Sequence, residues 1–462
     1  MSRLTVRDVV RATRGALVRG DLGVPVTGVS IDSRSLGVGE AFFAIRGHRL
    51  DGHAFVNEAA AQGAACVVVH HLPDEIPPHI PLILVDDTTP ALGRLAAFQR
   101  SRFSLPVVGI TGSNGKTTTK EMVAEILAGL GPVLKPEASF NNQWGLPLTL
   151  LRLRREHQAV VLELGANQRG EIATLAGIAR PTVGVVTTVA AAHTAFFGSL
   201  EEVQREKASL VQAIPPDGRV ILNGDDRRVR EMAREARCPV LLYGTSPDAD
   251  VKSVGPIDER AEGVKFTLEI AGQRESVRLA IPGRHNVTNA LAAAAVGYAL
   301  GRSIAEIAGG LQRARPVKGR CVWRPAGAIR ILDDTYNANP AAVEAALAVL
   351  CRARGAGRIL VALGDMLELG EIAEAAHRDV GRRVAQLGVA EFVGVGPLSV
   401  HAVAAARAAG VLESHHAGTA EEAIAILLKR LAPGDCLLVK GSRGMRMERV
   451  VDALVARLGG GE

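Results

Sequence analysis

A glycine-rich segment in the first third of the chain has the residue types that bind phosphate. It reads Gly109-Ile-Thr-Gly112-Ser-Asn-Gly115-Lys116-Thr117-Thr118 and lies between an apolar run and a helical segment. Glycines allow backbone N–H groups to turn toward a phosphate, and a helix N-terminus adds partial positive charge. In such loops the lysine reaches the β- and γ-phosphates and the next hydroxyl holds Mg²⁺, which assigns these roles to Lys116 and Thr117. The glycine spacing is a variant of the general pattern, and a turn that binds nothing is the alternative.

Polar side chains also occur in or after the apolar runs that we expect to be strands. Glu163 stands inside the run AVVLELG, where an unpaired carboxylate would be costly. We therefore expect Glu163 to be a Mg²⁺ ligand, with a paired or helix-capping glutamate as the alternative. His193 follows the run TVGVVTTV, although a lone histidine is more often structural.

The last third of the chain has similar polar residues at the ends of its apolar runs. The run IRILDD ends in Asp333 and Asp334. The run CLLVKG ends in Lys440 and Gly441, and Ser442 and Arg443 follow it. In open α/β sheets, ligands bind beyond the carboxyl ends of the strands. Two sheets with polar strand ends therefore indicate a shared cleft, which suits an enzyme with two substrates better than a nucleotide switch.

These residues must be positioned by helices and strands, and the pattern of apolar and helical segments along the chain predicts an α/β protein of three domains. Residues 1–103 mix short strands with helices, and residues 104–313 alternate apolar runs with helices around the glycine-rich loop. Such alternation predicts a parallel sheet covered on both faces. Residues 314–462 repeat the pattern and predict a Rossmann-like, doubly wound domain, with residues 314–320 as a linker and hinge.

The composition excludes several classes of protein. The 462 residues include 54 basic and 48 acidic side chains, a net charge of +6 without a dense basic block. We therefore expect no nucleic acid and no polybasic membrane anchor, whereas a small anionic substrate fits. The five cysteines form no CxxC pair, which suits a reducing cytoplasm.

Neither the N-terminus nor the longest uncharged run predicts a membrane segment. The first 20 residues carry charges throughout, so they do not resemble a signal peptide. The uncharged run 181–200 has the length of a membrane span but contains Pro181, Gly184, His193 and Gly198. We interpret it as a buried strand that enters a loop.

Several segments together resemble the Mur ligases, the ATP-dependent amide-forming enzymes of peptidoglycan synthesis. The loop TGSNGKTTTKE is shared across that family, and residues 29–56 are similar to its UDP-binding domain. Four narrower segments are ELGANQRGEI (163–172), DDTYNANP (333–340), LGDMLELG (363–370) and LVKGSRGMRME (438–448). ELGAN and DDTYNANP look like the branch of the family that adds D-alanyl-D-alanine.

The resemblance implies roles for individual residues at the nucleotide site. Those implied to be catalytic are Lys116, Glu163, His193 and Lys207, and those implied to hold two magnesium ions are Thr117, Glu163, His193 and Lys207. Those implied to bind ATP are Thr111, Gly112, Ser113, Asn114, Gly115, Lys116, Thr117, Thr118, Asn286, Asn289, Arg320 and Asp334. Lys207 aligns with a lysine that is carbamylated in sister enzymes, so a carbamate is expected here, with an exposed helix lysine as the alternative.

The resemblance also implies residues that bind the other substrates. Ser33 and Arg34 resemble the uridine-nucleotide site, and Asn141 and Asn142 fall in a loop near the muramoyl peptide. The third domain would contribute Tyr336, Asn337, Asn339, Lys440, Ser442 and Arg443. One segment departs from the family pattern, because many relatives have an asparagine shortly before the histidine where this chain has Thr187-Thr188-Val189. We expect that the asparagine contact is lost or is replaced by Thr188.

The implied activity is that of a carboxylate–amine ligase. It would join D-alanyl-D-alanine to UDP-N-acetylmuramoyl-tripeptide through an acyl phosphate, giving the pentapeptide product, ADP and phosphate in the bacterial cytoplasm, as a monomer. A sister ligase that adds a diamino acid would need its own acceptor motif in place of DDTYNANP. Folylpolyglutamate synthetase does not fit the UDP-type domain before the phosphate loop. A nucleotide-binding regulator without turnover would not need Glu163, His193 and the motifs of the third domain.

Overall fold

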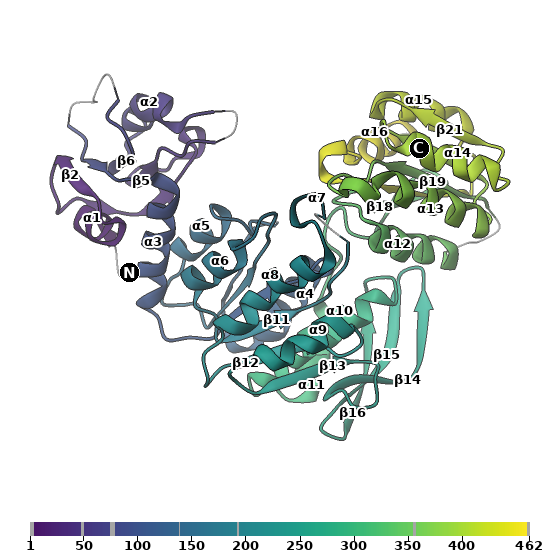
Figure 1. Cartoon of the computed structure of the whole chain (residues 1–462), viewed down its shortest axis with the longest axis horizontal. Helices are drawn as coiled ribbons and strands as arrows, with labels where there is room; N and C mark the ends of the chain where they lie inside the picture. Colours follow the sequence, from purple (N-terminus) through teal and green to yellow (C-terminus); the bar gives the residue numbers. More distant parts are fainter. Residues whose placement is uncertain are drawn as a thin grey trace.

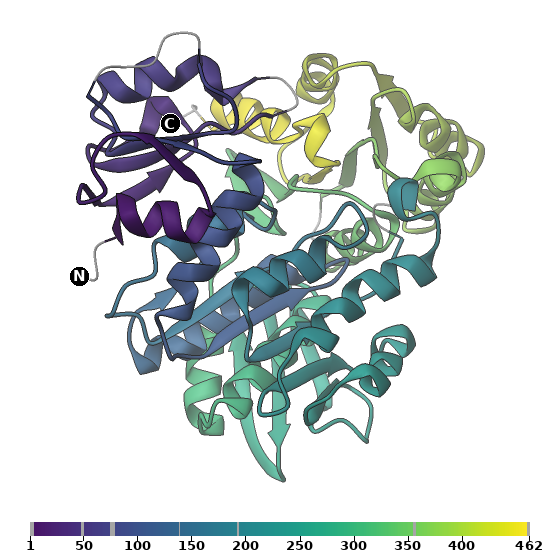
Figure 2. The same cartoon turned by 60° about the vertical axis from the view of Figure 1, so that its left-hand side comes forward.

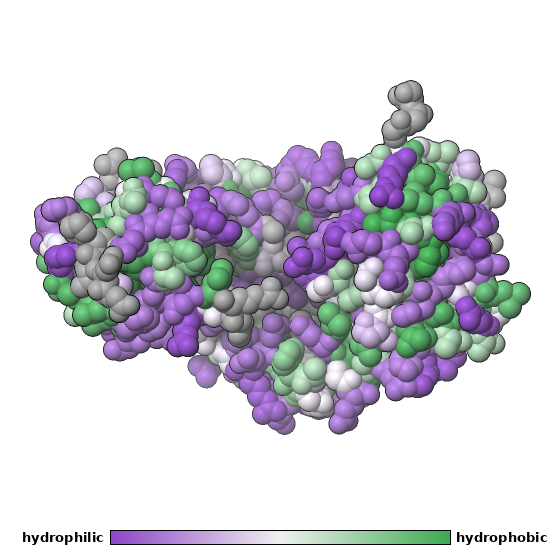
Figure 3. All heavy atoms as spheres, turned by 90° about the horizontal axis from the view of Figure 1, so that it is seen from above, coloured by the Kyte–Doolittle hydropathy of each residue, from purple (hydrophilic) through white to green (hydrophobic). Residues whose placement is uncertain are grey.

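The computed structural model describes residues 4–47, 50–73, 79–137, 139–191, 194–353 and 357–459. These residues form three α/β units, which confirms the predicted fold class. In Figure 1 the N-terminal unit lies at the upper left, the middle unit at the bottom and the C-terminal unit at the upper right. Seen from above in Figure 3, the molecule is elongated, and its largely hydrophilic surface is recessed between the two upper units.

The N-terminal unit is built on a small sheet with the strand order β2-β7-β6-β5-β4. Strands β4 to β7 are parallel, and β2 adds antiparallel to β7. Its strands are β1 (Leu4–Thr5), β2 (Ala16–Arg19), β3 (Pro25–Val26), β4 (Gly28–Ser30), β5 (Glu40–Phe43), β6 (Cys66–Val69) and β7 (Leu82–Leu84). Its helices are α1 (Val6–Thr13), α2 (Val56–Ala61) and α3 (Thr88–Ser101), with short 3₁₀ turns η1 (Ser33–Ser35) and η2 (Gly52–Phe55).

The middle unit contains a sheet with the strand order β16-β15-β14-β13-β12-β11-β8-β10-β9. Its strands are β8 (Val107–Thr111), β9 (Val133–Leu134), β10 (Ala159–Glu163), β11 (Val183–Val186), β12 (Arg219–Asn223), β13 (Val240–Gly244), β14 (Val251–Arg260), β15 (Gly263–Ile270) and β16 (Gln273–Leu279). Every neighbouring pair from β9 to β14 is parallel, as predicted. The antiparallel meander of β14, β15 and β16 is not predicted by the sequence pattern.

Helices cover both faces of this sheet, and the core consists mainly of aliphatic side chains. The helices are α4 (Lys116–Leu127), α5 (Gly145–Leu151), α6 (Glu171–Ala179), α7 (Thr194–Phe197), α8 (Leu200–Ala213), α9 (Arg227–Glu231), α10 (His285–Ala299) and α11 (Ile304–Arg313). Two clusters of buried residues lie on the two faces, one including α4, α10 and α11 and the other α5, α6 and α8. Helix α10 is rich in buried alanines, which allow close packing where aromatic residues are scarce.

The C-terminal unit is a second doubly wound sheet, with the strand order β17-β18-β22-β19-β20-β21. Its strands are β17 (Val322–Ala326), β18 (Ile329–Asp334), β19 (Ile359–Gly364), β20 (Glu391–Val395), β21 (Ser414–Ala417) and β22 (Cys436–Lys440). Its helices are α12 (Pro340–Arg352), α13 (Ala373–Gln386), α14 (Ser399–Ala408), α15 (Ala420–Arg430) and α16 (Glu448–Leu458). All neighbouring pairs except β17–β18 are parallel, so the strand ends at Asp334 and Lys440 share one edge.

Hydrogen bonds join the three units. Trp144, at the start of α5, donates its indole N–H to the Thr89 hydroxyl on α3 at 3.1 Å. Trp323 on β17 donates to the Ala261 carbonyl in the β14–β15 turn at 2.6 Å. Helix α7 lies close to the C-terminal unit in Figure 1, where its Ala195 N–H donates to the Glu368 carbonyl at 3.0 Å. Figure 2 shows the same arrangement from another side.

None of the helices in the described ranges is both long and apolar enough to cross a membrane. The run 181–200 instead contains β11 and, after it, the short helix α7. The expectation of a buried strand entering a loop is therefore confirmed for the described part of this run.

A buried carboxylate orders the C-terminal sheet and generates a stability prediction. Asp365 directly follows β19, is 1% exposed, and accepts the N–H groups of Leu398 and Ser399 at the start of α14 at 3.1 and 2.7 Å. Asp365→Ala removes both bonds and leaves the buried N–H groups unpaired, so we expect a loss of about 2–4 kcal/mol in the free energy of unfolding. Urea unfolding followed by Trp323 fluorescence, in a Trp144→Phe background, measures this in the C-terminal unit.

The matched control is Asp379→Ala, which removes an exposed carboxylate from an i,i+3 pair with Arg382 on α13. We expect this change to stay within about 0.5 kcal/mol. Equal effects of the two substitutions would contradict the role given to Asp365.

Candidate active site

The glycine-rich loop joins β8 to α4 and can be built only with glycines at two positions. Gly112 and Gly115 have φ angles of +144° and +83°, in the region that favours glycine. A Cβ atom at Gly112 would lie 1.9 Å from Thr187 Oγ1, and one at Gly115 would lie 2.2 Å from Asn289 Oδ1. Lys116, the first residue of α4, folds back so that its Nζ donates to the Gly112 carbonyl at 2.7 Å. The loop, the helix N-terminus and the lysine thus converge, as phosphate binding requires.

The segment after β11 holds this loop in place. The backbone N–H of Asn114 donates to Thr188 Oγ1 at 3.1 Å, and the N–H of Ser113 donates to the Thr188 carbonyl at 2.8 Å. The Thr187 hydroxyl donates to the Asn114 carbonyl at 2.6 Å. Thr188 therefore contacts the loop through both its hydroxyl and its carbonyl oxygen.

Glu163 ends β10 beside the loop and is 2% exposed. Its two carboxylate oxygens accept hydrogen bonds from Thr117 Oγ1 at 2.7 Å and from Asn141 Nδ2 at 2.8 Å. Both hydrogen-bond partners are neutral, so neither of them supplies a positive charge to this buried carboxylate. The position does not cap a helix, and its oxygen ligands are of the kind that Mg²⁺ prefers.

The C-terminal unit reaches the same hydroxyl. Arg320 Nη2 donates to Thr117 Oγ1 at 2.8 Å, and its guanidinium lies over the Tyr336 ring, 4.1 Å from the centroid. Arg320 Nε is buried and has no hydrogen-bond partner among the described atoms. The positively charged Arg320 is therefore already in position to donate to an anion that binds beside Thr117.

Two lysines lie in this region, the half-buried Lys116 and the buried Lys207. Burial lowers the pKa of Lys116, and nearby Arg320 lowers it further, while Glu163 acts in the opposite direction. Burial also lowers the pKa of Lys207 on α8 to about 7, with a further contribution from Lys116 and an opposing one from Glu206. Lys207 is 5% exposed, which excludes the alternative of an exposed helix lysine.

Glu206, next to Lys207, is a positioning residue that the sequence pattern does not identify. Its carboxylate accepts the N–H groups of Gly170 and Ile172, both at 2.7 Å, at the start of α6. It thereby fixes the segment that follows Glu163. The only signal in the sequence is its adjacency to Lys207, and charged neighbours on a helix are common.

An amide pair joins the phosphate loop to the C-terminal unit. Asn339 Nδ2 donates to Asn114 Oδ1 at 2.8 Å. Asn339 also caps α12, because its Oδ1 accepts the N–H of Ala342 at 2.9 Å. Two residues predicted for different ligands, ATP and the second substrate, are therefore in direct contact.

The other polar strand ends of the C-terminal unit form one network. Lys440, 2% exposed, donates to Asp334 Oδ2 at 2.5 Å and to the Asn337 carbonyl at 2.8 Å. Asp334 Oδ1 also accepts the N–H of Cys321 at 3.1 Å. Ser442 Oγ accepts the N–H of Leu367 at 2.8 Å. Arg443 donates to Glu448 at 3.0 Å at the rim of this network.

The predicted adenine-side residues lie on α10, below the loop. Asn289 Nδ2 donates to Asn286 Oδ1 at 2.9 Å, and Asn286 Nδ2 donates to the Pro282 carbonyl at 2.7 Å. The neighbouring His285 is half-buried, and its partial burial lowers its pKa, with Asp334 of the C-terminal unit acting in the opposite direction. Thr111 donates to the Leu164 carbonyl at 2.9 Å, and Thr118 lies in the first turn of α4.

The remaining predicted residues are not brought into this cluster. Ser33, in η1 of the N-terminal unit, donates to Glu58 at 3.1 Å, and the exposed Arg34 pairs with Asp32 at 2.6 Å. Asn142 accepts the N–H groups of Trp144 and Gly145 at 3.2 and 2.9 Å, so its side chain caps the start of α5. His193 lies outside the described residues.

Comparisons with known proteins agree along nearly the whole chain. Family models match residues 25–100 (Mur ligase family, catalytic domain), 110–297 (Mur ligase middle domain) and 319–443 (Mur ligase, glutamate ligase domain). The UDP-N-acetylmuramoyl-tripeptide–D-alanyl-D-alanine ligase of Mycobacterium tuberculosis (strain ATCC 25618 / H37Rv) is 36% identical, covering 99% of this chain and 98% of the relative. The enzyme of the same name from Escherichia coli (strain K12) is 37% identical, covering 98% and 99%.

Solved structures show the same similarity. A crystal structure of MurF from Acinetobacter baumannii has a TM-score of 0.90 and 33% identity, covering 99% of this chain and 100% of that chain. MurF from Thermotoga maritima in complex with ADP has a TM-score of 0.82 and 27% identity, covering 94% and 98%.

The buried amine of Lys207 predicts an unusual dependence of stability on pH. Because its pKa of about 7 lies below the ordinary value of 10.5, the unfolded chain binds more protons than the folded chain between these two values. The stability of the unmodified protein relative to Lys207→Met should therefore rise with pH across this window, by up to about 1.4 kcal/mol per pH unit. Urea unfolding in CO₂-free buffers at several pH values measures the difference.

Lys429→Met is the matched control, because Lys429 lies on α15 and is exposed. Its amine is not desolvated, so the corresponding difference should stay flat with pH. A flat or falling difference for Lys207→Met would contradict the burial argument.

Proposed function

The chain belongs to the Mur ligase family, and from this premise we propose how its residues carry out the reaction. It is an ATP-dependent ligase that joins D-alanyl-D-alanine to UDP-N-acetylmuramoyl-tripeptide in peptidoglycan synthesis, the activity that the names of its full-length relatives state. One observation gives the main support for this active site: the phosphate loop, Glu163 and Arg320 meet at a single hydroxyl, Thr117 Oγ1. A diamino-acid ligase of the same fold is only 16% identical.

The chemistry requires activation of a carboxylate. A carboxylate does not acylate an amine at neutral pH because its leaving group is poor. The terminal carboxylate of the tripeptide takes the γ-phosphoryl group of ATP, and ADP leaves. The free amine of D-alanyl-D-alanine attacks the resulting acyl phosphate, and phosphate leaves as the amide forms. Both steps bring anions together, so the protein acts mainly by positioning and by neutralising charge.

The phosphate loop and two cations supply that charge. Lys116, now bonded to the Gly112 carbonyl, can turn toward the β- and γ-phosphates through its flexible stem. Arg320 approaches from the C-terminal unit with an unpaired, buried Nε. Donors from two units therefore meet where the phosphoryl group is transferred. The other loop residues, from Thr111 to Thr118, shape the cradle, and Asn286, Asn289 and Asp334 serve the nucleoside end.

The residues present fit magnesium. The buried Glu163 carboxylate, hydrogen-bonded by neutral groups, and the Thr117 hydroxyl offer hard oxygen ligands. We assign two ions to Thr117, Glu163, His193 and a carbamate on Lys207. Bound magnesium would neutralise the negative charge of the phosphate oxygens and would thereby favour transfer of the phosphoryl group. The carbamate would form when the neutral Lys207 amine adds to carbon dioxide and releases a proton. The neutral amine is available near pH 7 because the pKa of Lys207 is about 7.

The outer units bind the other substrates. We assign residues 1–103, with Ser33 and Arg34, to the UDP part of the nucleotide substrate. Residues 104–313 bind ATP, with Asn141 and Asn142 near the muramoyl peptide. Asn141 also donates to Glu163, and Asn142 also accepts the Gly145 N–H. Residues 314–462 complete the nucleotide site and bind the dipeptide through Tyr336, Asn337, Asn339, Lys440, Ser442 and Arg443. The enzyme would act as a monomer in the bacterial cytoplasm, and residues 314–320 would be the hinge.

Omission of single substrates tests the activity. Phosphate release should require ATP, UDP-N-acetylmuramoyl-tripeptide and D-alanyl-D-alanine together. Lys116→Ala should lower the rate by at least about 100-fold, since one preorganised charge at a transferring group is worth that much. Lys265→Ala, on the exposed face of β15, is the control and should leave the rate unchanged. Release that continues without the dipeptide would refute the assignment.

Dependence on carbon dioxide tests the carbamate. In a CO₂-depleted buffer the rate should fall, and added bicarbonate should restore it. A ¹³C-bicarbonate NMR experiment should show one carbamate resonance that is absent in Lys207→Met. Lys207→Arg should not recover activity, because a guanidinium does not lose its proton. Full activity of either variant, or no carbamate resonance in the unmodified protein, would contradict this assignment.

A further inference from the structure

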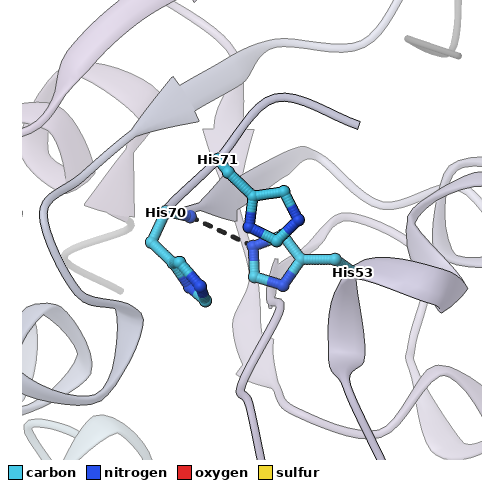
Figure 4. Close-up of side chains that lie close together, drawn as sticks. All are labelled: His53, His70 and His71. Carbon is cyan, nitrogen blue, oxygen red and sulfur yellow. Dashed lines mark hydrogen bonds between the residues drawn. The ribbon is translucent and has the colours of Figure 1, made fainter. Parts of the chain in front are cut away.

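Three histidines gather in the N-terminal unit, away from the phosphate loop. His53 lies in η2, and His70 and His71 directly follow β6. Each offers a ring nitrogen, and these three nitrogens lie within 4.8 Å of one another. Figure 4 shows the three rings converging from the two segments, with the His71 ring over that of His53.

Asp51 holds the central ring in one tautomer. Its Oδ1 lies 2.6 Å from His53 Nδ1, and the same carboxylate oxygen accepts the His53 backbone N–H at 3.0 Å. His53 is 8% exposed. A carboxylate on one ring nitrogen fixes the proton there and leaves the other nitrogen as a lone-pair donor, which is the usual support of a metal-bound histidine.

One of the remaining nitrogens has no partner, and another would have to exchange its partner for a metal. His53 Nε2 accepts the backbone N–H of His70 at 3.1 Å, and this hydrogen bond would be replaced by the bond to the ion. His70 Nδ1 is buried and has no hydrogen-bond partner in the described part of the chain. A buried nitrogen without a partner is costly, and a cation in the cluster would satisfy it.

Metal binding requires the loss of the His70 N–H bond to His53 Nε2 and a movement of the ring nitrogens toward one another. Tetrahedral coordination with bonds of about 2.0–2.1 Å places two ligand nitrogens about 3.4 Å apart. The nitrogens of the cluster must therefore approach one another by roughly 1.4 Å at most. His71 is exposed, so its ring can turn from its stacked position, 3.9 Å from the His53 centroid, without disturbing the core.

We propose that His53, His70 and His71 bind one divalent transition-metal ion, with Asp51 as the residue that orients His53. Three imidazoles select zinc and neighbouring first-row ions over magnesium, and a solvent molecule completes a four-coordinate site. This site is separate from the magnesium ligands assigned around Glu163 and does not depend on the proposed function.

The position in the fold gives the site a mechanical role. Parallel strands β4, β5 and β6 end at one edge of the N-terminal sheet. The ion would tie the segment after β6 to η2, which follows β5, at the edge where β4 leads to Ser33. It would thus fasten the loops that surround the proposed uridine-nucleotide site.

Isothermal titration of the full-length chain tests the proposal. The protein is prepared without an affinity tag, treated with EDTA, and titrated with zinc in the presence of excess magnesium. We expect one zinc ion per chain, and a Co²⁺-loaded sample should show the visible absorption of a four-coordinate site. The double variant His70→Gln/His71→Gln should weaken zinc binding by more than about 100-fold, and Asp51→Asn by about 10–100-fold.

A second adjacent histidine pair provides the matched control. His415 and His416 lie on β21 of the C-terminal unit, so His415→Gln/His416→Gln should leave zinc affinity unchanged. The single variant His71→Gln changes only an exposed ring and keeps the measurement valid if the double variant unfolds. Absence of saturable zinc binding, or equal affinity in His71→Gln and the unmodified chain, would overturn the proposal.

Discussion

The structure depends on a carboxylate that is buried beside a phosphate loop and, within the part of the chain that the structure describes, has no cation among its hydrogen-bond partners. Removing a charge from water costs several kcal/mol unless other groups compensate it. From the described residues Glu163 receives a hydroxyl and an amide bond, and the hydroxyl of Thr117 in turn receives Arg320 from another unit. The Thr117 hydroxyl oxygen therefore links three parts of the structure: Glu163 at the end of β10, the phosphate loop, and Arg320 of the C-terminal unit. The geometry explains why the active site cannot belong to one unit alone.

The cations around this carboxylate give the site its selectivity for anions. Burial makes the protonated forms of Lys116 and Lys207 less favourable. An anion that binds nearby would therefore stabilise the protonated form of both amines. The ligase brings together the phosphates of two nucleotides and a peptide carboxylate, all of which carry that charge. The overall charge of +6 fits a protein whose substrates are anions.

The sequence predicts what depends on local pattern. The phosphate loop, the strand ends and the parallel sheets follow from glycine spacing and from apolar runs between helices, and the family resemblance is confirmed along the chain. The β14–β16 meander was missed because Gly255 and Pro256 interrupt β14, at the place where its register with β15 shifts. Glu206 and the pairing of Asn114 with Asn339 were missed because they depend on residues distant in sequence. Asn142 stays a prediction for the peptide site, and the sequence pattern does not indicate that its side chain also accepts the Gly145 N–H at the start of α5.

The two glycines of the loop restrict how this protein can change over evolutionary time. At Gly112 and Gly115 any side chain would overlap Thr187 or Asn289 and would also strain a backbone with positive φ. Neither position can therefore change independently of the side chain that it faces. A compound that binds the backbone of this loop would therefore contact a surface that single substitutions cannot reshape without loss of the fold around the nucleotide. Escape from such a compound would have to arise elsewhere.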